Sequence, residues 1–200
     1  MKIDMHCHVR EGSIDSKVPI EEFIKKLQSK GIGGMLVTDH DTYNGYRHWK
    51  NTVKGRKYKD FVVLKGIEYD TLDAGHILII MPQGVKMRLL ELRGLPLSLL
   101  IDFVHPCGEK YLSFTNTKRW QKSPELIEKF DFIETFNACE PPQSNEGAKY
   151  LAEKYGKPGT GGSDAHKLDC VGMGYTEFPV RIETELDLIR QIREKGEIQS

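Results

Sequence analysis

The chain has 200 residues and a mass of 22.9 kDa, which is the size of one domain. Charged residues make up 29% of the sequence and hydrophobic residues 38%, and this balance excludes both an intrinsically disordered chain and a membrane-embedded one. The 29 Lys and Arg residues equal the 29 Asp and Glu residues in number. The formal net charge is therefore zero, and a large nucleic acid, which usually meets a basic surface, is not an expected partner.

Short apolar runs alternate with amphipathic stretches along the chain. In chain order, the predicted strands cover Lys2–His6, Gly33–Thr38, Phe61–Ile67, His76–Met81, Ile101–His105, Phe132–Phe136, Gly159–Gly162 and Gly174–Phe178. Repeated strand–helix units favour a mainly parallel sheet with helices outside it, either doubly wound or closed as a barrel. Because no repeat or linker interrupts the pattern, residues 1–200 are expected to form a single α/β domain.

Helix signals lie between these runs. Apolar residues recur at helical spacing from Ile20 to Leu27 and stop before Gly31. Ser123-Pro124-Glu125 predicts the start of a helix that runs through Phe130, and Asn145–Tyr155 predicts another. A last helix is expected to begin after Thr184 and to end at Gly196, because Thr is a good N-cap and Gly a common helix stop.

The cysteines and the hydropathy pattern bear on the compartment. The four cysteines, Cys7, Cys107, Cys139 and Cys170, are far apart in sequence and form no Cys-x-x-Cys motif, which favours a reducing environment. The longest uninterrupted apolar run, Ile77–Met81, is too short to span a bilayer, and no signal-peptide pattern opens the sequence. A cytoplasmic location without membrane contact is therefore expected.

Imidazole and carboxylate side chains gather at the predicted strand ends. Of the seven histidines, all except His48 lie at or beside such an end. In a barrel the carboxyl ends of the strands converge on one face, where active sites are built. His6 and His8 are two residues apart, so on a strand they point to the same side and can chelate one ion; Asp164 and His166 repeat this spacing. Nitrogen and oxygen ligands suit zinc, manganese or iron, so the sequence predicts a metal site.

Several residues near these ends have a second interpretation. Asp4 is a candidate for orienting an imidazole rather than binding metal itself. Asp39 and Asp41 flank His40 and are better explained by capping and turn hydrogen bonds than by ligation. His76 is either a ligand or a core histidine that is hydrogen-bonded to the backbone.

A series of segments in chain order also resembles a known family. The segments are Ile3-Asp4-Met5-His6-Cys7-His8, Thr38-Asp39-His40-Asp41, Gly66-Ile67-Glu68, Val104-His105-Pro106, Phe136-Asn137 and Gly162-Ser163-Asp164-Ala165-His166. The series is similar to the small members of the PHP (polymerase and histidinol phosphatase) family. The resemblance implies a distorted (β/α)7 barrel and a cluster of two or three divalent ions, Mn, Zn or Fe, that hydrolyses phosphoesters.

By position, the resemblance also implies a ligand set. One ion would take His6, His8, Glu68 and Asp164, and another would take Asp15, His40 and His166. Glu68 would bridge to a remaining ion held by His105 and His76. Glu11 remains a rival to Asp15, and the variable placement of the histidine at position 76 leaves two ions as an alternative to three. The residues expected to carry catalysis are His6, His8, Glu68, Asp164 and His166.

The expected activity is phosphoester hydrolysis by a metal-activated hydroxide, on a small phosphorylated molecule or a nucleotide. Lys118 and Arg119 are candidates for binding the phosphate, although a solvated turn explains them equally well. Two alternatives stay open: a barrel metallohydrolase of amidohydrolase type, which Thr38–Asp41 and Gly162–His166 fit poorly, and a non-catalytic metal-binding regulatory module. The sequence does not determine the oligomeric state.

Overall fold

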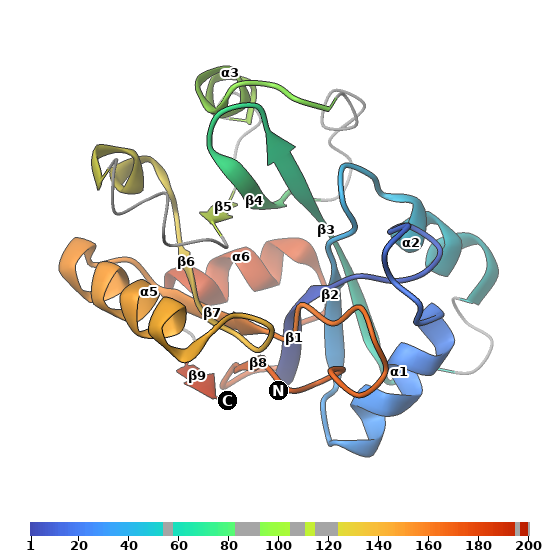
Figure 1. Ribbon diagram of the computed structural model, residues 1–200. Coiled ribbons are helices and arrows are strands. Elements are labelled where there is room, and N and C mark those ends of the chain that lie inside the picture. Colours follow the sequence, from blue (N-terminus) through green and yellow to red (C-terminus); the bar gives the residue numbers. More distant parts are fainter. Residues whose placement is uncertain (54–57, 83–92, 105–110, 115–123, 195–196, 200) are drawn as a thin grey trace.

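The computed structural model describes residues 1–53, 58–82, 93–104, 111–114, 124–194 and 197–199 (Figure 1). The larger of its two sheets has the strand order β5-β4-β3-β2-β1-β8-β9. In this order the strands are Tyr111–Phe114, Gly75–Ile80, Val62–Thr71, Gly34–Val37, Lys2–Cys7, Tyr175–Glu177 and Glu197–Gln199. The central strands β1, β2 and β3 are parallel, whereas β3–β4, β4–β5, β1–β8 and β8–β9 are antiparallel pairs.

The smaller sheet pairs β6 (Ile133–Asn137) with β7 (Gly159–Gly162) in parallel. Its carboxyl end lies against that of β1, because the Asp164 amide donates to the His6 carbonyl over 2.8 Å. Gly162 permits this approach: a Cβ atom at this position would lie 2.4 Å from the Cβ atom of His6. The carboxyl ends of β1 and β7 are thus held side by side.

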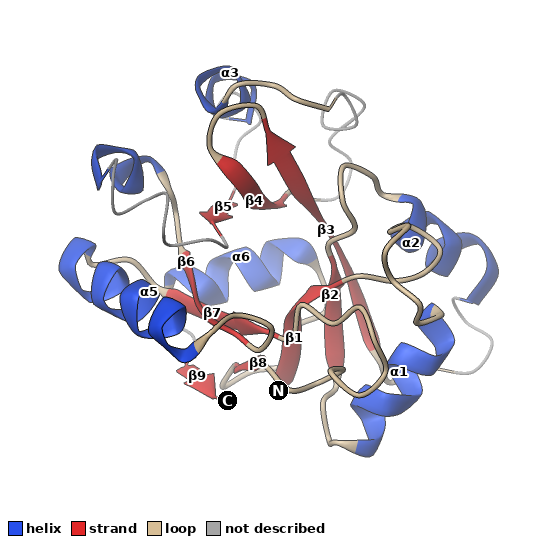
Figure 2. Cartoon of the chain, in the orientation of Figure 1, coloured by secondary structure: helices blue, strands red, loops and turns tan. Residues whose placement is uncertain are grey.

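The helices cover the outside of this curled arrangement (Figures 1 and 2). They are α1 (Ile20–Ser29), α2 (Asn44–His48) with the π-helical turn Trp49–Val53, α3 (Leu97–Val104), the 3-10 helix Pro124–Lys129, α5 (Pro142–Tyr155) and α6 (Glu185–Arg193). The apolar stripe predicted for the first helix is fully buried, from Ile20 to Leu27. None of the described helices is long and apolar enough to cross a membrane.

Two expectations from the sequence need correction. The run predicted as the strand Ile101–His105 lies instead in α3 as far as Val104, and His105 falls outside the described residues. A short apolar run does not by itself distinguish a strand from a buried helix. The sheet is mixed rather than mainly parallel, because β4 folds back on β3 as a hairpin. The strands form a curled half-barrel in two sheets, and in the described part of the chain no ladder joins β5 to β6 or β7 to β1.

Candidate metal centre

Imidazole and carboxylate groups from four strands of the larger sheet and from the end of β7 meet in one place. His6 and Glu68 lie in β1 and β3, His76 lies in β4, and the remaining groups follow β1, β2 and β7. Within each of the following groups, the potential ligand atoms lie within 4.8 Å of one another: His6, His8, Glu68 and Asp164; His8, His40 and His166; His40, Glu68 and His76. The groups overlap, because His8, His40 and Glu68 each belong to two of them.

The first group is the most enclosed. His6 and His8 are completely buried, and their Nε2 atoms are 3.0 Å apart. Glu68 Oε2 lies 3.3 Å from the Nε2 atom of His6 and 3.1 Å from that of His8. Asp164 Oδ1 lies 3.4 Å and 3.2 Å from the same two nitrogens. Two nitrogens and two oxygens therefore surround one point.

Asp15 joins the two histidines with which the resemblance grouped it. Its Oδ2 atom is 3.3 Å from His40 Nε2 and 3.2 Å from His166 Nε2. The loop that carries it is fixed beside β7, because the Lys17 amide donates to the His166 carbonyl over 3.0 Å. Glu11, the rival candidate, accepts a hydrogen bond from the Ile20 amide at the start of α1. Asp15 is therefore the acid that reaches the cluster.

His76 lies at the open side of the cluster. Its Nδ1 atom is 3.1 Å from Glu68 Oε1, and its side chain is 42% exposed. In the described residues its side chain meets the carboxylates of Glu68 and Asp70 and is too exposed for a core position, so the core-histidine interpretation is wrong. Three other predicted site residues, His105, Lys118 and Arg119, lie outside the described residues.

Hydrogen bonds fix which ring nitrogen of His6, His8 and His166 faces the cluster. Ser13 Oγ donates to Asp39 Oδ1 over 3.0 Å and accepts from the His40 amide over 3.2 Å. A hydroxyl has one donor and two acceptor positions, so its remaining position accepts the Nδ1–H group of His8, 3.1 Å away. This arrangement makes Nε2 the nitrogen of His8 that faces Glu68 and Asp164.

His6 and His166 are oriented in the same sense. His6 Nδ1 is 2.8 Å from Glu134 Oε1, and His166 Nδ1 is 3.0 Å from the Asp164 carbonyl oxygen. Each acceptor takes a hydrogen bond from Nδ1–H, so Nε2 is the nitrogen that faces the cluster. Imidazoles that bind metal are usually held in this way, with the second nitrogen donating to a carboxylate or a carbonyl.

The aspartates near the cluster, Asp4, Asp39 and Asp41, accept hydrogen bonds from backbone amides. Asp39 accepts from the amides of Val9 and Gly45, as expected for a turn residue. Asp41 accepts from the amide of Asp70 over 2.9 Å. Asp4 accepts from the amides of Ser163 and His6 rather than from an imidazole, and it thus links β1 to β7. Asp4 therefore does not orient an imidazole directly; Glu134 and Ser13 contact those of His6 and His8.

Strain marks the same region. Asp41 and Asp164 are the non-glycine residues with positive φ in the described chain, at 52° and 50°. Backbone in this left-handed region is unfavourable for residues with a Cβ atom, and it concentrates at functional sites where the surrounding structure enforces it. At Asp164 the enforced turn directs the carboxylate toward His6 and His8.

Enclosed negative charge shifts the pKa values of these groups. Burial lowers the pKa of His8, but hydrogen bonds with Asp164 and Glu68 outweigh burial and raise it to about 9. Burial likewise lowers the pKa of His6, but Asp164, Glu134 and Glu68 raise it well above its ordinary value. Burial raises the pKa of Asp164, yet the imidazoles of His6 and His8 bring it down to about 2. A pocket that holds protons this strongly is also suited to a divalent cation.

The residues present fit a divalent metal ion. Every donor in the three groups is an imidazole nitrogen or a carboxylate oxygen, the combination preferred by zinc, manganese and iron. Cys7 is completely buried and packs in the apolar cluster with Val9 and Val37, so it faces away from the site, as the strand alternation predicts. The model for the PHP domain matches residues 4–154 of the chain.

The chain belongs to the PHP domain family. A second family model, described as PHP-associated, matches residues 142–196 of this PHP protein. No protein of curated function matches it in sequence.

Solved structures share the fold of this PHP protein at low sequence identity. PsfC from Pseudomonas syringae PB-5123 superimposes with a TM-score of 0.72 and 18% identity, over 99% of this chain and 90% of PsfC. A two-domain protein from Bacteroides vulgatus, containing a predicted PHP-like metal-dependent phosphoesterase, gives 0.65 and 15%, over 100% of this chain and 64% of that one. The lesion-specific endonuclease PfuEndoQ from Pyrococcus furiosus gives 0.68 and 16%, over 99% and 58%.

Sequence reasoning missed three residues that support the site. Ser13 and Glu134 hold the imidazoles of His8 and His6, and Asn137, quoted only as part of a segment, contacts Asp164. A serine in a loop and a glutamate within a strand carry no distinctive spacing. Glu134, the charged residue in a strand whose other residues are uncharged, was the one available signal, because buried carboxylates are rare without a partner.

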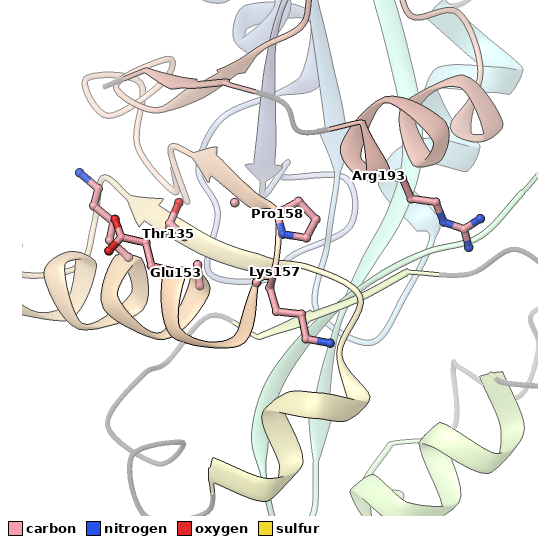
Figure 3. Close-up of a pocket in the computed structure, with 9 residues that line it drawn as sticks. Thr135, Glu153, Lys157, Pro158 and Arg193 are labelled. Carbon is pink, nitrogen blue, oxygen red and sulfur yellow. The ribbon is translucent and has the colours of Figure 1, made fainter.

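A separate hollow of about 510 Å³ lies at the opposite end of β7 from Asp164. Its lining includes Gly159 at the start of β7, Glu153 and Lys157 near the end of α5, and Arg193 at the end of α6. The charged ends of Lys157 and Arg193 lie apart from each other (Figure 3). They do not converge on one point, as the metal-centre residues do.

Proposed function

We propose that this PHP protein is a metal-dependent phosphoesterase that hydrolyses a small phosphorylated molecule or a nucleotide with about two or three divalent ions of Mn, Zn or Fe. The observation that carries the proposal is the overlap of the three groups of donors at Glu68, His8 and His40. Ions held by shared ligands lie close together, which is the arrangement used to cleave phosphoesters.

In this proposal each group of donors has a defined role. His6, His8, Glu68 and Asp164 would hold one ion, and Asp15, His40 and His166 a second. Glu68 and His76, with His105, would hold a third. Bound ions of this kind lower the pKa of a coordinated water and neutralise the charge of phosphate oxygens. The chain's own contribution is to fix the donors: the buried hydrogen bonds of His6 and His8 keep Nε2 directed inward before substrate arrives.

We also propose that residues 1–200 form one domain in which β6 and β7 complete a distorted (β/α)7 barrel. The bond from the Asp164 amide to the His6 carbonyl supports this arrangement, since it brings β7 against β1. Lys118 and Arg119 remain candidates for phosphate binding within the proposal.

A nucleic-acid endonuclease is the second candidate. The fold shared with PfuEndoQ over nearly the whole chain favours it, because a phosphodiester presents the same bond to the same donors. The zero net charge favours the smaller substrate, since protein surfaces that bind nucleic acid are usually basic.

The test is a panel of substrates with metal-reconstituted protein. Release of phosphate from an aryl phosphomonoester and from nucleoside monophosphates in the presence of Mn²⁺, abolished by EDTA, would support the first proposal. Cleavage of a duplex with an abasic site, without action on monoesters, would favour the endonuclease. Hydrolysis of amides but of no phosphoester would favour the amidohydrolase alternative, and inactivity on the whole panel despite bound metal would favour a regulatory module.

A further inference from the structure

Glu134 is a buried acid that faces the metal centre from outside the ligand groups. It lies in β6, whose other residues are all uncharged, and it is 2% exposed. Its Oε1 atom is 2.8 Å from His6 Nδ1. Its Oε2 atom accepts from Asn137 Nδ2 over 3.1 Å.

Asn137 extends this contact to a second side chain of the cluster. The same Nδ2 group donates to Asp164 Oδ2 over 3.1 Å, while Asn137 Oδ1 accepts from the Cys139 amide over 2.8 Å. The amide oxygen is thus committed to the backbone, which fixes the amide so that its two N–H groups face Glu134 and Asp164. One carboxylate on β6 is therefore connected to His6 in β1 and, through Asn137, to Asp164 after β7.

A buried carboxylate is costly unless it is paired. In the described part of the chain, the ion pair found for Glu134 is with His6. An apolar residue of similar size at this position would fill the space in β6 without that cost, so stability alone does not account for an acid. The acid does serve the imidazole: it fixes the Nδ1–H tautomer and increases the donor strength of Nε2.

We propose that Glu134 is a positioning residue that sets the affinity of this centre for divalent metal, acting on His6 directly and on Asp164 through Asn137. The inference rests on the metal site of the proposed function but not on its substrate. Two donors, His6 Nδ1–H and Asn137 Nδ2–H, are met by the two oxygens of one carboxylate. A glutamine offers a single acceptor to these two donors, and its own N–H group would face one of them.

The test measures metal affinity and stability separately. Glu134→Gln and Asn137→Ala are compared with the wild-type chain, each titrated with Mn²⁺ against a competing chelator, and each unfolded chemically in EDTA. Thr135→Val is the matched control on the same strand. It removes the bond from the Thr135 hydroxyl to the Thr160 carbonyl and leaves the metal centre untouched.

For Glu134→Gln we expect Mn²⁺ affinity to fall about tenfold to a hundredfold, the usual effect of removing such a partner. The variant should still fold in EDTA but with a lower unfolding midpoint, because glutamine removes one partner of the buried Glu134–His6 pair; the affinity is therefore compared on folded protein. Asn137→Ala should weaken Mn²⁺ binding in the same direction by a smaller factor. Thr135→Val should lower the midpoint in EDTA and leave Mn²⁺ affinity unchanged.

Two outcomes would overturn the inference. One is wild-type Mn²⁺ affinity in Glu134→Gln; the other is a loss of affinity that merely follows a loss of folded protein, as for a structural residue. Failure of the proposed function is seen separately, as wild-type chain that binds Mn²⁺ but hydrolyses no phosphoester, and in that case the expected order of affinities still holds.

Discussion

Replacing Glu68 with glutamine tests the most connected residue of the centre. Its Oε2 atom lies 3.3 Å from His6 Nε2, 3.1 Å from His8 Nε2 and 3.2 Å from His40 Nδ1, and its Oε1 atom faces His76. The side chain of glutamine is nearly the same size, but it is neutral and its amide nitrogen cannot ligate a cation. Glu68→Gln should therefore lose or displace an ion shared between groups.

The expected magnitude follows from this geometry. A displacement of about 1 Å costs roughly a hundredfold in rate, or about 2.7 kcal/mol of transition-state stabilisation, so kcat should fall at least this far. His76→Ala should cost about tenfold, because this partly exposed imidazole has one close contact in the cluster and water can take its place.

The assay is kcat and metal content of both variants on one phosphoester at saturating Mn²⁺. Glu185→Gln is the matched control: Glu185 is another buried glutamate, but its Oε1 atom accepts from the Lys65 amide, away from the metal centre. Its kcat and metal content should match those of the wild-type chain. Equal losses in Glu68→Gln and His76→Ala would refute the distinction, and a mild Glu68→Gln phenotype would remove the bridging role.

Three further predictions concern the same centre. After reconstitution, elemental analysis should find about two to three divalent ions per chain, and well under one ion would contradict a multinuclear site. Asp164→Asn and His6→Ala should abolish turnover while the far-ultraviolet circular dichroism stays native, because both side chains lie at the carboxyl ends of strands, apart from the three apolar clusters of the core; near-native turnover with saturating metal would reject the ligand assignment at that position. In EDTA the chain should lose stability as pH rises from about 6.5 to about 9, because the pKa of His8 is raised to about 9 and its charge stabilises the fold fully only below the unfolded value of 6.5. The loss is on the order of 3 kcal/mol, measured by urea unfolding, and a flat or rising profile would refute it.

Features that depend on neighbours in sequence could be predicted. The first helix follows from apolar spacing at Ile20–Leu27, and the last helix begins with the expected capping signal, since Thr184 and Asp187 form a capping box. The pair His6–His8 could be predicted as candidate ligands because a spacing of two residues gives one side of an extended chain. Asp164 and His166 have the same spacing, but a left-handed turn at Asp164, with φ 50°, rather than an extended strand directs its carboxylate to the cluster. Periodicity, capping and this alternation act over a few residues, so the sequence carries them directly.

Pairing between distant segments was decided only by the tertiary structure. The apolar run near Ile101 is compatible with both a strand and a helix. In the folded chain it forms part of α3, and Leu97, Leu100 and Ile101 pack together in the hydrophobic core. Glu134 is 128 residues from His6 in sequence, and no local pattern connects the two. Their contact exists because β6 pairs with β7 and the end of β7 is bonded to β1. The sequence by itself therefore determined which groups are available to bind a metal, whereas the packing of the strands determined which of them meet and how each imidazole is oriented.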